Sequence, residues 1–454
     1  MKSHQPNLNK STSLLIAASL CVGAAAPVFA NDELSFEWDW AVSYEAAKQR
    51  DSAFMQAQGS SRDSLNALNA LNALLDVQVN YQNFSGLFAL YSQGLYLNQQ
   101  GESEWWSEAD NQLLIRELAW LGEWQVGDTT LDVSLGKLRV DWGVGYGYRP
   151  LDLFKPYRQN PVGLVAEEGA GVFSLSHYGM AGEWSVIATD SSWGQQDQSA
   201  LDQAAEQQGV GIRRYALVGD TEYQLIGYYD DVRRGLLGAS AIAVWDESIA
   251  MHGSILWQKQ SVGYQFQQDD LYQPVSAEEQ GSAFQSLVGV NWANQAGHNV
   301  IAEYWYDSRA WSKSEWQQAI ERGELLSQIP EPNNSLLASS ALLATSYAQG
   351  FQHANIVQHN VMLHWSWDVE AWAAWNGKAD MGWLSDVTPT LDVMLSPQDG
   401  GVIVTQWLNY QWIDTGDQSV EVEVAARFLT GDDQSAYAQI NDKHMIVFNI
   451  KGKF

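Results

Sequence analysis

The chain is poor in several features that stabilise or identify other classes of protein. Its 454 residues include a single cysteine, so no disulfide can form within it. Lysine and arginine number 24 against 54 aspartate and glutamate, a formal net charge of −30, and such a chain lacks the basic face that nucleic acid requires. Residues 31–454 contain no continuous apolar run of the ~20 residues that a membrane-spanning helix needs. These absences exclude a disulfide-stabilised fold, a nucleic-acid-binding protein and a bundle of membrane-spanning helices before any motif is considered.

The first thirty residues have the organisation of a secretory signal peptide. Basic residues precede an apolar run from Leu14 to Val22, and small residues follow up to Ala30. This order predicts export with cleavage after Ala30. The single cysteine, Cys21, lies inside the signal and follows Leu20, which does not suit a lipoprotein cleavage site. We therefore expect an exported mature chain without cysteine and without a lipid anchor.

The abundant residues are aromatic residues and glycine. Trp, Tyr and Phe make up 12% of the chain, with 22 Trp, and there are 37 Gly against 10 Pro. The mean hydropathy is slightly polar, at −0.27. Transmembrane barrels give this average because each strand alternates lipid-facing with lumen-facing residues, and they carry aromatic girdles at both membrane interfaces. The composition is therefore compatible with a membrane barrel as well as with a soluble protein.

The C-terminal segment, His444 to Phe454, alternates with a period of two. Ile446, Phe448, Ile450 and Phe454 share one face, and the residues between them are mostly polar. An alternating strand that ends on a terminal Phe resembles the closing strand of bacterial outer-membrane β-barrels of the porin-like kind. The resemblance implies that Phe448, Ile450 and Phe454 form the signal that the barrel assembly machinery recognises. An ordinary amphipathic edge strand of a soluble β-domain is the alternative.

The same alternation recurs along the chain. Apolar and polar residues alternate within 75–82, 262–267, 361–368 and 420–428, and the polar rows include charged side chains. A full apolar row opposite a charged row is explained better by lipid outside and an aqueous lumen inside than by a sandwich core. We therefore predict an all-β fold, a transmembrane antiparallel β-barrel of about 18 strands, within a range of 16 to 20.

The predicted barrel spans residues 75–454, after the signal peptide at 1–30. Residues 31–74 are an N-terminal lead-in that is either a first strand or a periplasmic spacer. Within it, the tandem Leu-Asn-Ala units of Leu65–Ala73 repeat every three residues and are interpreted as a short polar helix or spacer.

Four long connections separate the predicted strands, at residues 148–169, 191–208, 268–283 and 309–354. The last contains a predicted helix from Ser314 to Ile329. Because a structureless loop of that length is unusual in a compact domain, we expect it to fold into the lumen or over its mouth. Short turns at one end and long loops at the other are typical of outer-membrane barrels.

The candidate pore-lining residues follow from strand parity. A bulge expected near Gly136 changes the parity of its strand, so that Lys137, Arg139 and Asp141 share the polar face. The stretch from Gly136 to Arg158 resembles porin-like families with an inward-folding loop. This resemblance favours a channel function but does not indicate which solute passes. The alternative, given equal weight, is that the basic residues of this stretch form ion pairs with acidic residues that stabilise the fold. The other candidates by parity are Glu303, Asp307, His364, Asp368, Glu421, Glu423 and Arg427.

The residues give no support to catalysis, metals or cofactors. Ser176 and His177, or His364 and Ser366, supply residue types found in hydrolases but in no recognisable motif. Asp432-Asp433 lacks the spaced oxygens of a calcium loop. No catalytic residue, metal or cofactor is predicted.

The sequence therefore predicts an outer-membrane channel for passive diffusion of small polar solutes or ions, with a preference for cations because of the acidic excess. The expected partners are outer-membrane lipid and lipopolysaccharide, the barrel assembly machinery and a possible periplasmic protein, and not nucleic acid. Two alternatives stay open. One is a plugged barrel that docks or exports periplasmic proteins or polymers, and the other is a secreted soluble all-β carbohydrate-binding protein.

Overall fold

The computed structural model describes most of the chain from residue 34 onwards. The residues described are 34–54, 65–99, 102–154, 164, 166–196, 199–267, 270–327, 334–368 and 386–453. The predicted signal peptide and the terminal Phe454 lie outside this part of the chain. So do residues 369–377, whose weak alternation in the sequence predicts a further strand.

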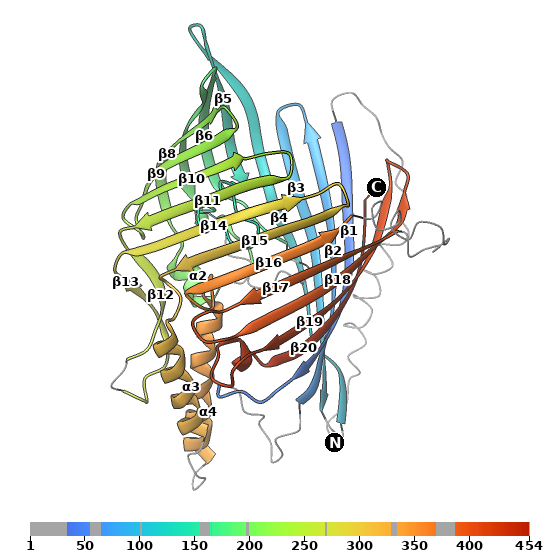
Figure 1. Cartoon of the computed structure of the whole chain (residues 1–454), viewed down its shortest axis with the longest axis vertical. Helices are drawn as coiled ribbons and strands as arrows, with labels where there is room; N and C mark the ends of the chain where they lie inside the picture. The colour runs from blue at the N-terminus through green and yellow to red at the C-terminus, as the bar shows by residue number, and fades with distance from the viewer. Residues whose placement is uncertain are drawn as a thin grey trace, which may run out of the picture.

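Eighteen antiparallel strands form one closed barrel (Figure 1). Each strand pairs with its neighbours in the chain, except that β11 pairs with β14, and the barrel closes where β20 pairs with β1. The predicted fold and strand number are confirmed. The barrel strands are β1 (Leu34–Gln49), β2 (Leu65–Tyr81), β3 (Phe84–Gln99), β4 (Glu102–Val126), β5 (Thr129–Leu138), β6 (Ala170–Gly179), β7 (Gly182–Asp190), β8 (Gln208–Val218), β9 (Thr221–Asp230), β10 (Leu236–Val244), β11 (Ile249–Gln258), β14 (Ala283–Ala293), β15 (His298–Asp307), β16 (His359–Trp367), β17 (Val387–Leu395), β18 (Val402–Asp414), β19 (Ser419–Thr430) and β20 (Asp442–Lys453).

The two faces of the wall differ in the way that a barrel in lipid requires. On β20, Ile446 and Phe448 are 59% and 41% exposed, whereas Val447 and Asn449 between them are 1% and 5% exposed. The exposed row is apolar and faces outward, and the covered row is largely polar and faces the lumen. Large apolar side chains in contact with solvent would be unfavourable in water, so this outer surface fits hydrocarbon and not a soluble protein.

The N-terminal lead-in belongs to the barrel. β1 is the first strand, one of the two alternatives left open, and pairs with β2 from Leu34↔Tyr81 to Ala47↔Leu68. The interpretation of Leu65–Ala73 as a helix or spacer was wrong, because these residues form the first half of β2. The start of the barrel at residue 75 was wrong for the same reason. Strand pairing on both sides, with β1 and β3, overrides the three-residue repeat of this segment.

The two ends of the barrel have different connections. At one end, tight turns join neighbouring strands, such as residues 82–83 between β2 and β3 and 219–220 between β8 and β9. At the other end lie long connections, including 139–169 between β5 and β6 and 308–358 between β15 and β16. This asymmetry agrees with the predicted orientation, in which short turns face the periplasm and long loops face the exterior.

The long connections pack together into a cap over one end of the barrel. It contains the hairpin of β12 (Ser261–Gln265) and β13 (Ser276–Gln280), and the helices α3 (Lys313–Ser327) and α4 (Asn334–Ser346), which stand beyond the barrel wall (Figure 1). The helix predicted at Ser314–Ile329 is confirmed as α3. The alternation at 262–267 is real but β12 pairs only with β13, outside the barrel. No described helix is long and apolar enough to cross a membrane.

Aromatic residues from separate connections form the core of the cap. Phe54, Tyr264, Trp316, Tyr347 and Tyr437 are each at most 1% exposed and belong to one cluster. They come from the β1–β2 connection, the β12–β13 hairpin, the β15–β16 connection and the β19–β20 connection. Side chains of this size dominate the energy of a small core. The loops are therefore held as one body over the mouth of the barrel.

A buried histidine links two parts of the cap. The Tyr264 backbone N–H donates to His353 Nε2 at 2.9 Å, and the Nδ1 atom lies 3.1 Å from the Gly350 carbonyl oxygen, to which it donates. These contacts need the neutral ring. Burial accordingly lowers the pKa of His353 to about 4.

The cap should lose stability in acid. Because the unfolded His353 titrates near ~6.5 and the folded one near about 4, its protonation favours unfolding as the pH falls through this window, by up to about 3 kcal/mol. The protection factors of residues 313–327 against hydrogen exchange, which correct for the slower intrinsic exchange at lower pH, should therefore fall between neutral pH and pH ~5. The effect should be reduced in His353→Gln and retained in His177→Gln, which alters an exposed histidine on β6. An equal loss of protection in both variants would contradict the assignment.

Candidate functional site: the lumen constriction

The β5–β6 connection folds into the barrel. Its first part, 139–154, and its last part, 164 and 166–169, are called the inward loop. Trp142, Leu151 and Phe154 pack in one cluster with inner-wall residues such as Ile226 of β9 and Leu256 of β11. Leu151 is fully buried there. The apolar residues of the loop thus cover apolar positions of the lumen wall and fix the loop along it.

Further along the loop, Tyr148 extends this packing to the next strands. It clusters with Leu287 of β14, Trp305 of β15 and Met362 of β16. Between these contacts, Gly145 approaches the Tyr148 carbonyl so closely that a Cβ atom would lie 1.8 Å from that oxygen. The glycine at position 145 is therefore required for the tight path of the chain.

Glu303 of β15 holds the loop at its turn. Its two carboxylate oxygens accept hydrogen bonds from the backbone N–H groups of Tyr146 and Gly147, both at 2.7 Å, and Oε1 lies 2.7 Å from His252 Nε2 of β11. Glu303 is 2% exposed. A carboxylate that accepts from consecutive backbone amides makes charge-assisted hydrogen bonds, which are among the stronger kind in proteins. Glu303 therefore acts as a clamp between the wall and the loop.

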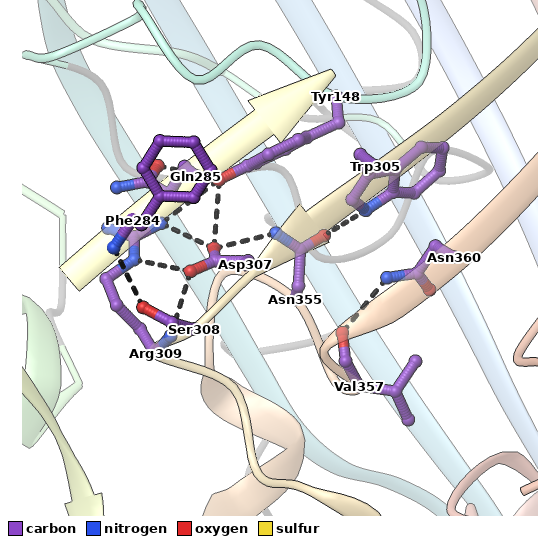
Figure 2. A network of polar contacts seen from close by, with 10 residues as sticks. All are labelled: Tyr148, Phe284, Gln285, Trp305, Asp307, Ser308, Arg309, Asn355, Val357 and Asn360. Carbon is purple, nitrogen blue, oxygen red and sulfur yellow. Dashed lines mark hydrogen bonds and ion pairs between the residues drawn. The ribbon is translucent and has the colours of Figure 1, made fainter. Parts of the chain in front are cut away.

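A second network lies where β15 ends, and Figure 2 shows its members around Asp307. Asp307 accepts from Tyr148 Oη at 2.9 Å, from Asn355 Nδ2 at 2.9 Å and from Arg309 at 2.7 Å. Trp305 Nε1 donates to Asn355 Oδ1 at 2.9 Å. Asp307 is 1% exposed. This network connects the inward loop, the barrel wall and the start of the cap.

The last part of the inward loop is tied to the opposite wall. Lys137 Nζ and Glu168 Oε1 form a buried ion pair at 2.5 Å. Arg116 of β4 donates to the Glu167 carbonyl at 2.9 Å, and the Gly169 N–H donates to the Arg116 carbonyl at 2.9 Å. Arg139 forms an ion pair with Glu117. The two parts of the inward loop are thus attached to different sides of the barrel.

Between the cap and the inward loop lies a cavity of about 1580 Å³, lined by both charged and apolar side chains. Its wall includes Arg139, Asp141, His364, Glu423 and Arg427, five of the ten predicted pore-lining residues. The cavity also touches amide side chains from the wall and the cap. Its charged lining comprises nine acidic residues, Asp141, Asp152, Glu167, Glu168, Asp202, Glu206, Asp392, Glu423 and Asp442, and five basic ones, Arg139, Arg149, Arg233, Arg309 and Arg427.

The other predicted residues have different places. Lys137, Glu303 and Asp307 face inward but are covered by the inward loop and the cap, as described above. Glu421 faces inward on β19 and lies 3.3 Å from Lys451 Nζ. Asp368 is not part of the cavity lining: it follows the end of β16 and is exposed, and its N–H donates to the Gly297 carbonyl at the turn end of the barrel at 2.8 Å.

The parity change at Gly136 has a different cause from the expected bulge. Pairing of β5 with β4 runs through Ala119↔Gly136 and Leu118↔Lys137 without a shift in register. Gly136 itself has φ 140°, and a Cβ atom there would lie 2.2 Å from the Leu118 carbonyl oxygen. A glycine in a backbone conformation that other residues rarely adopt turns Lys137 towards the lumen.

Sequence reasoning missed the partners of the candidate residues. Asp392 of β17 has two such contacts. Its Oδ1 atom lies 2.6 Å from His364 Nδ1, and its Oδ2 atom accepts a hydrogen bond from Trp407 Nε1 at 2.9 Å. Glu117 and Arg116 both turn inward because the register with β3 shifts between Leu87 and Phe88. Parity within β17 could have found Asp392, whereas a bulge on a neighbouring strand left no signal that could have found Arg116. Within the described ranges, no group of three or more His, Cys, Asp or Glu could hold a metal ion.

A scan against protein-family models and a search of curated proteins gave no match. Among solved structures, the chain resembles OccAB1 of Acinetobacter baumannii, with 9% identity, a TM-score of 0.51, and coverage of 95% of this chain and 98% of that one. It also resembles OccK7 (OpdD) of Pseudomonas aeruginosa, with 8% identity, a TM-score of 0.51, and coverage of 93% and 98%. The fold is that of the outer-membrane channels. At such identities the likeness concerns the fold alone, and it confirms the predicted porin-like barrel at that level.

The clamp can be tested by replacing Glu303 with Gln. The NH2 group of Gln replaces one carboxylate oxygen and is a donor, so it cannot accept from the backbone N–H that it would face, and the loop should lose about 2–4 kcal/mol of attachment. Single-channel recordings should then show a larger and noisier conductance with added substates. Glu421→Gln is the matched control, since it removes a lumen carboxylate that contacts only Lys451 among the described ion pairs. A quiet, unchanged conductance in Glu303→Gln would show that packing alone holds the loop.

Proposed function

We propose that this protein is an outer-membrane channel for passive diffusion of small polar solutes or ions, with a preference for cations. The observation that carries the proposal is a cavity of about 1580 Å³, with many charged residues in its lining, inside a closed barrel whose outer face is apolar. The proposal assigns no chemical step to the lumen residues. It places the cap outside the cell and the tight turns in the periplasm.

The preference for cations follows from how the lumen charges are arranged. Of the five basic residues at the cavity, Arg139, Arg149, Arg233 and Arg309 form ion pairs with Glu117, Asp152, Asp230 and Asp307 respectively. An ion-paired guanidinium attracts a passing anion less than a free one, because the carboxylate beside it cancels most of its field. Four acidic residues of the lining are ion-paired as well, namely Asp152, Glu167, Glu168 and Glu423. The nine acidic residues still outnumber the five basic ones. The net field in the lumen therefore favours cations.

Membrane insertion relies on the residues expected to form the assembly signal. Phe448 and the rest of the apolar row of β20 face outward, on the strand that closes the barrel against β1. Ile450 is in the same row, and Phe454 lies outside the described residues. The recognition of this strand by assembly machinery, and contact of the cap with lipopolysaccharide, are parts of the proposal.

Reconstitution tests the proposal directly. The mature protein in planar bilayers should conduct, and its reversal potential under a salt gradient should show cations passing more readily than anions. An absence of conductance would favour the plugged barrel. A preference for anions would mean that the acidic residues of the lining lie outside the path that ions take. Extraction of the protein into water without detergent would favour the soluble alternative instead.

The arrangement of charges in the lumen predicts how the ion selectivity changes when Arg139 loses an ion-pair partner. Glu117→Gln removes the nearer ion-pair partner of Arg139, whose Nη1 also lies 3.9 Å from Glu167 Oε2, and should lower the cation-to-anion permeability ratio about threefold to fivefold, as expected for a unit charge worth about 1 kcal/mol near a hydrated ion. Arg139→Gln combined with Glu117→Gln should restore the original ratio. The measurement is the reversal potential of each variant. A ratio that stays low in the double variant would mean that Glu117 acts directly on ions and not through Arg139.

A further inference from the structure

A strand edge is left open at the end of the barrel with the tight turns. β4 pairs with β3 only as far as Phe84↔Trp120, but pairs with β5 as far as Val126↔Thr129. The β4–β5 hairpin therefore projects beyond the β2–β3 turn, and it stands out at the end opposite to α3 and α4 (Figure 1). Residues 122–126 have β5 on one side and, within the described part of the chain, no strand on the other.

The direction of the unpaired backbone groups follows from the last contact with β3. The Leu121 N–H donates to the Asn83 carbonyl at 2.7 Å, so Leu121 presents its backbone groups to the open side. Successive residues of a strand alternate, so Glu123 and Gln125 also present their N–H and C=O groups to that side. With the Leu121 carbonyl, this gives a short row of donors and acceptors in the spacing that an added strand would use.

The side chains of the hairpin indicate the chemistry of such a strand. Glu123 lies directly opposite Asp132 in the register of β4 with β5, and both are exposed. Like charges directly opposite each other destabilise a strand pair, and no ion pair to a basic side chain relieves either of them among the described residues. On the other face, Trp124 and Val126 are 61% and 59% exposed. The edge thus has one acidic face and one apolar face.

We propose that this edge, Leu121 to Val126, binds an extended segment of a periplasmic protein in which basic and apolar residues alternate. The segment adds a strand to β4, its basic side chains lie beside Glu123 and Asp132, and its apolar side chains lie beside Trp124 and Val126. A second copy of this chain is disfavoured as the occupant, because it would bring the same two carboxylates to the contact. The placement in the periplasm rests on the orientation under Proposed function, but the binding itself does not.

The test uses the full mature chain in detergent and a synthetic probe, the peptide Lys-Val-Lys-Val-Lys-Val-Lys with blocked ends. Binding is followed by calorimetry. The control peptide has the same side chains but a methyl group on every peptide nitrogen, so it cannot donate to a strand edge. The unmodified peptide should bind at least about tenfold more tightly than the methylated one, since several backbone hydrogen bonds are lost.

Variants of the edge separate strand addition from charge attraction. Gln125→Pro removes an N–H that faces the open side and should weaken binding about tenfold, whereas Gln125→Ala should leave it within about twofold. Glu123→Gln with Asp132→Asn should weaken binding and reduce its dependence on salt. None of these variants lies at the lumen constriction, so all should conduct as the parent does, and a failure of the channel proposal would leave this test intact.

Three results would overturn the inference. They are no binding of the unmodified peptide, equal binding of the methylated peptide, and equal binding by Gln125→Pro and Gln125→Ala. The side of the membrane is tested separately with Asp128→Cys, in the turn of the hairpin, in an otherwise cysteine-free mature chain. A membrane-impermeant thiol reagent should label intact cells only after the outer membrane is opened, and labelling of intact cells would reject a periplasmic partner.

Discussion

The backbone hydrogen bonds between β1 and β20 are the interaction on which the rest of this structure depends. Hydrocarbon offers no partner for an amide group, so a sheet can cross a membrane only if its two edges meet. Asp39↔Lys453 through Ala47↔Met445 join the two ends of the chain across the seam. Once the sheet is closed, the period of two assigns every side chain to lipid or to the lumen, and the long connections can lie only at the ends or inside.

A closed wall of this width leaves an interior that strand side chains alone do not fill. The chain fills part of it with the inward loop, whose apolar residues cover apolar wall positions and whose backbone is held by Glu303, Arg116 and the pair of Lys137 with Glu168. Buried charges are tolerated there because each is paired or accepts several hydrogen bonds. The interior is therefore held both by apolar clusters between the loop and the wall and by buried polar contacts, and the space that remains is the cavity.

Much of this could be predicted from the sequence, and the limits have physical causes. Alternation over β16, β19 and β20 was strong enough to predict the barrel, and parity within β15 and β19 placed Glu303, Asp307 and Glu423 on the inner face. It could not show that the inward loop covers Glu303 and Asp307, because contacts between residues some 150 positions apart leave no periodic signal. Leu65–Ala73 was misjudged because pairing with two neighbours outweighs a local repeat, and Arg116 was missed because a register shift changes parity without marking the sequence.

The clamp at Glu303 grips only main-chain atoms of Tyr146 and Gly147. These hydrogen bonds therefore do not depend on which side chain is present at position 146. The Tyr146 ring itself lies beside His364 at the cavity. The width of the passage and the chemistry of its lining are in this way separable properties. A protein built like this could exchange the residue that meets the solute while keeping the aperture unchanged.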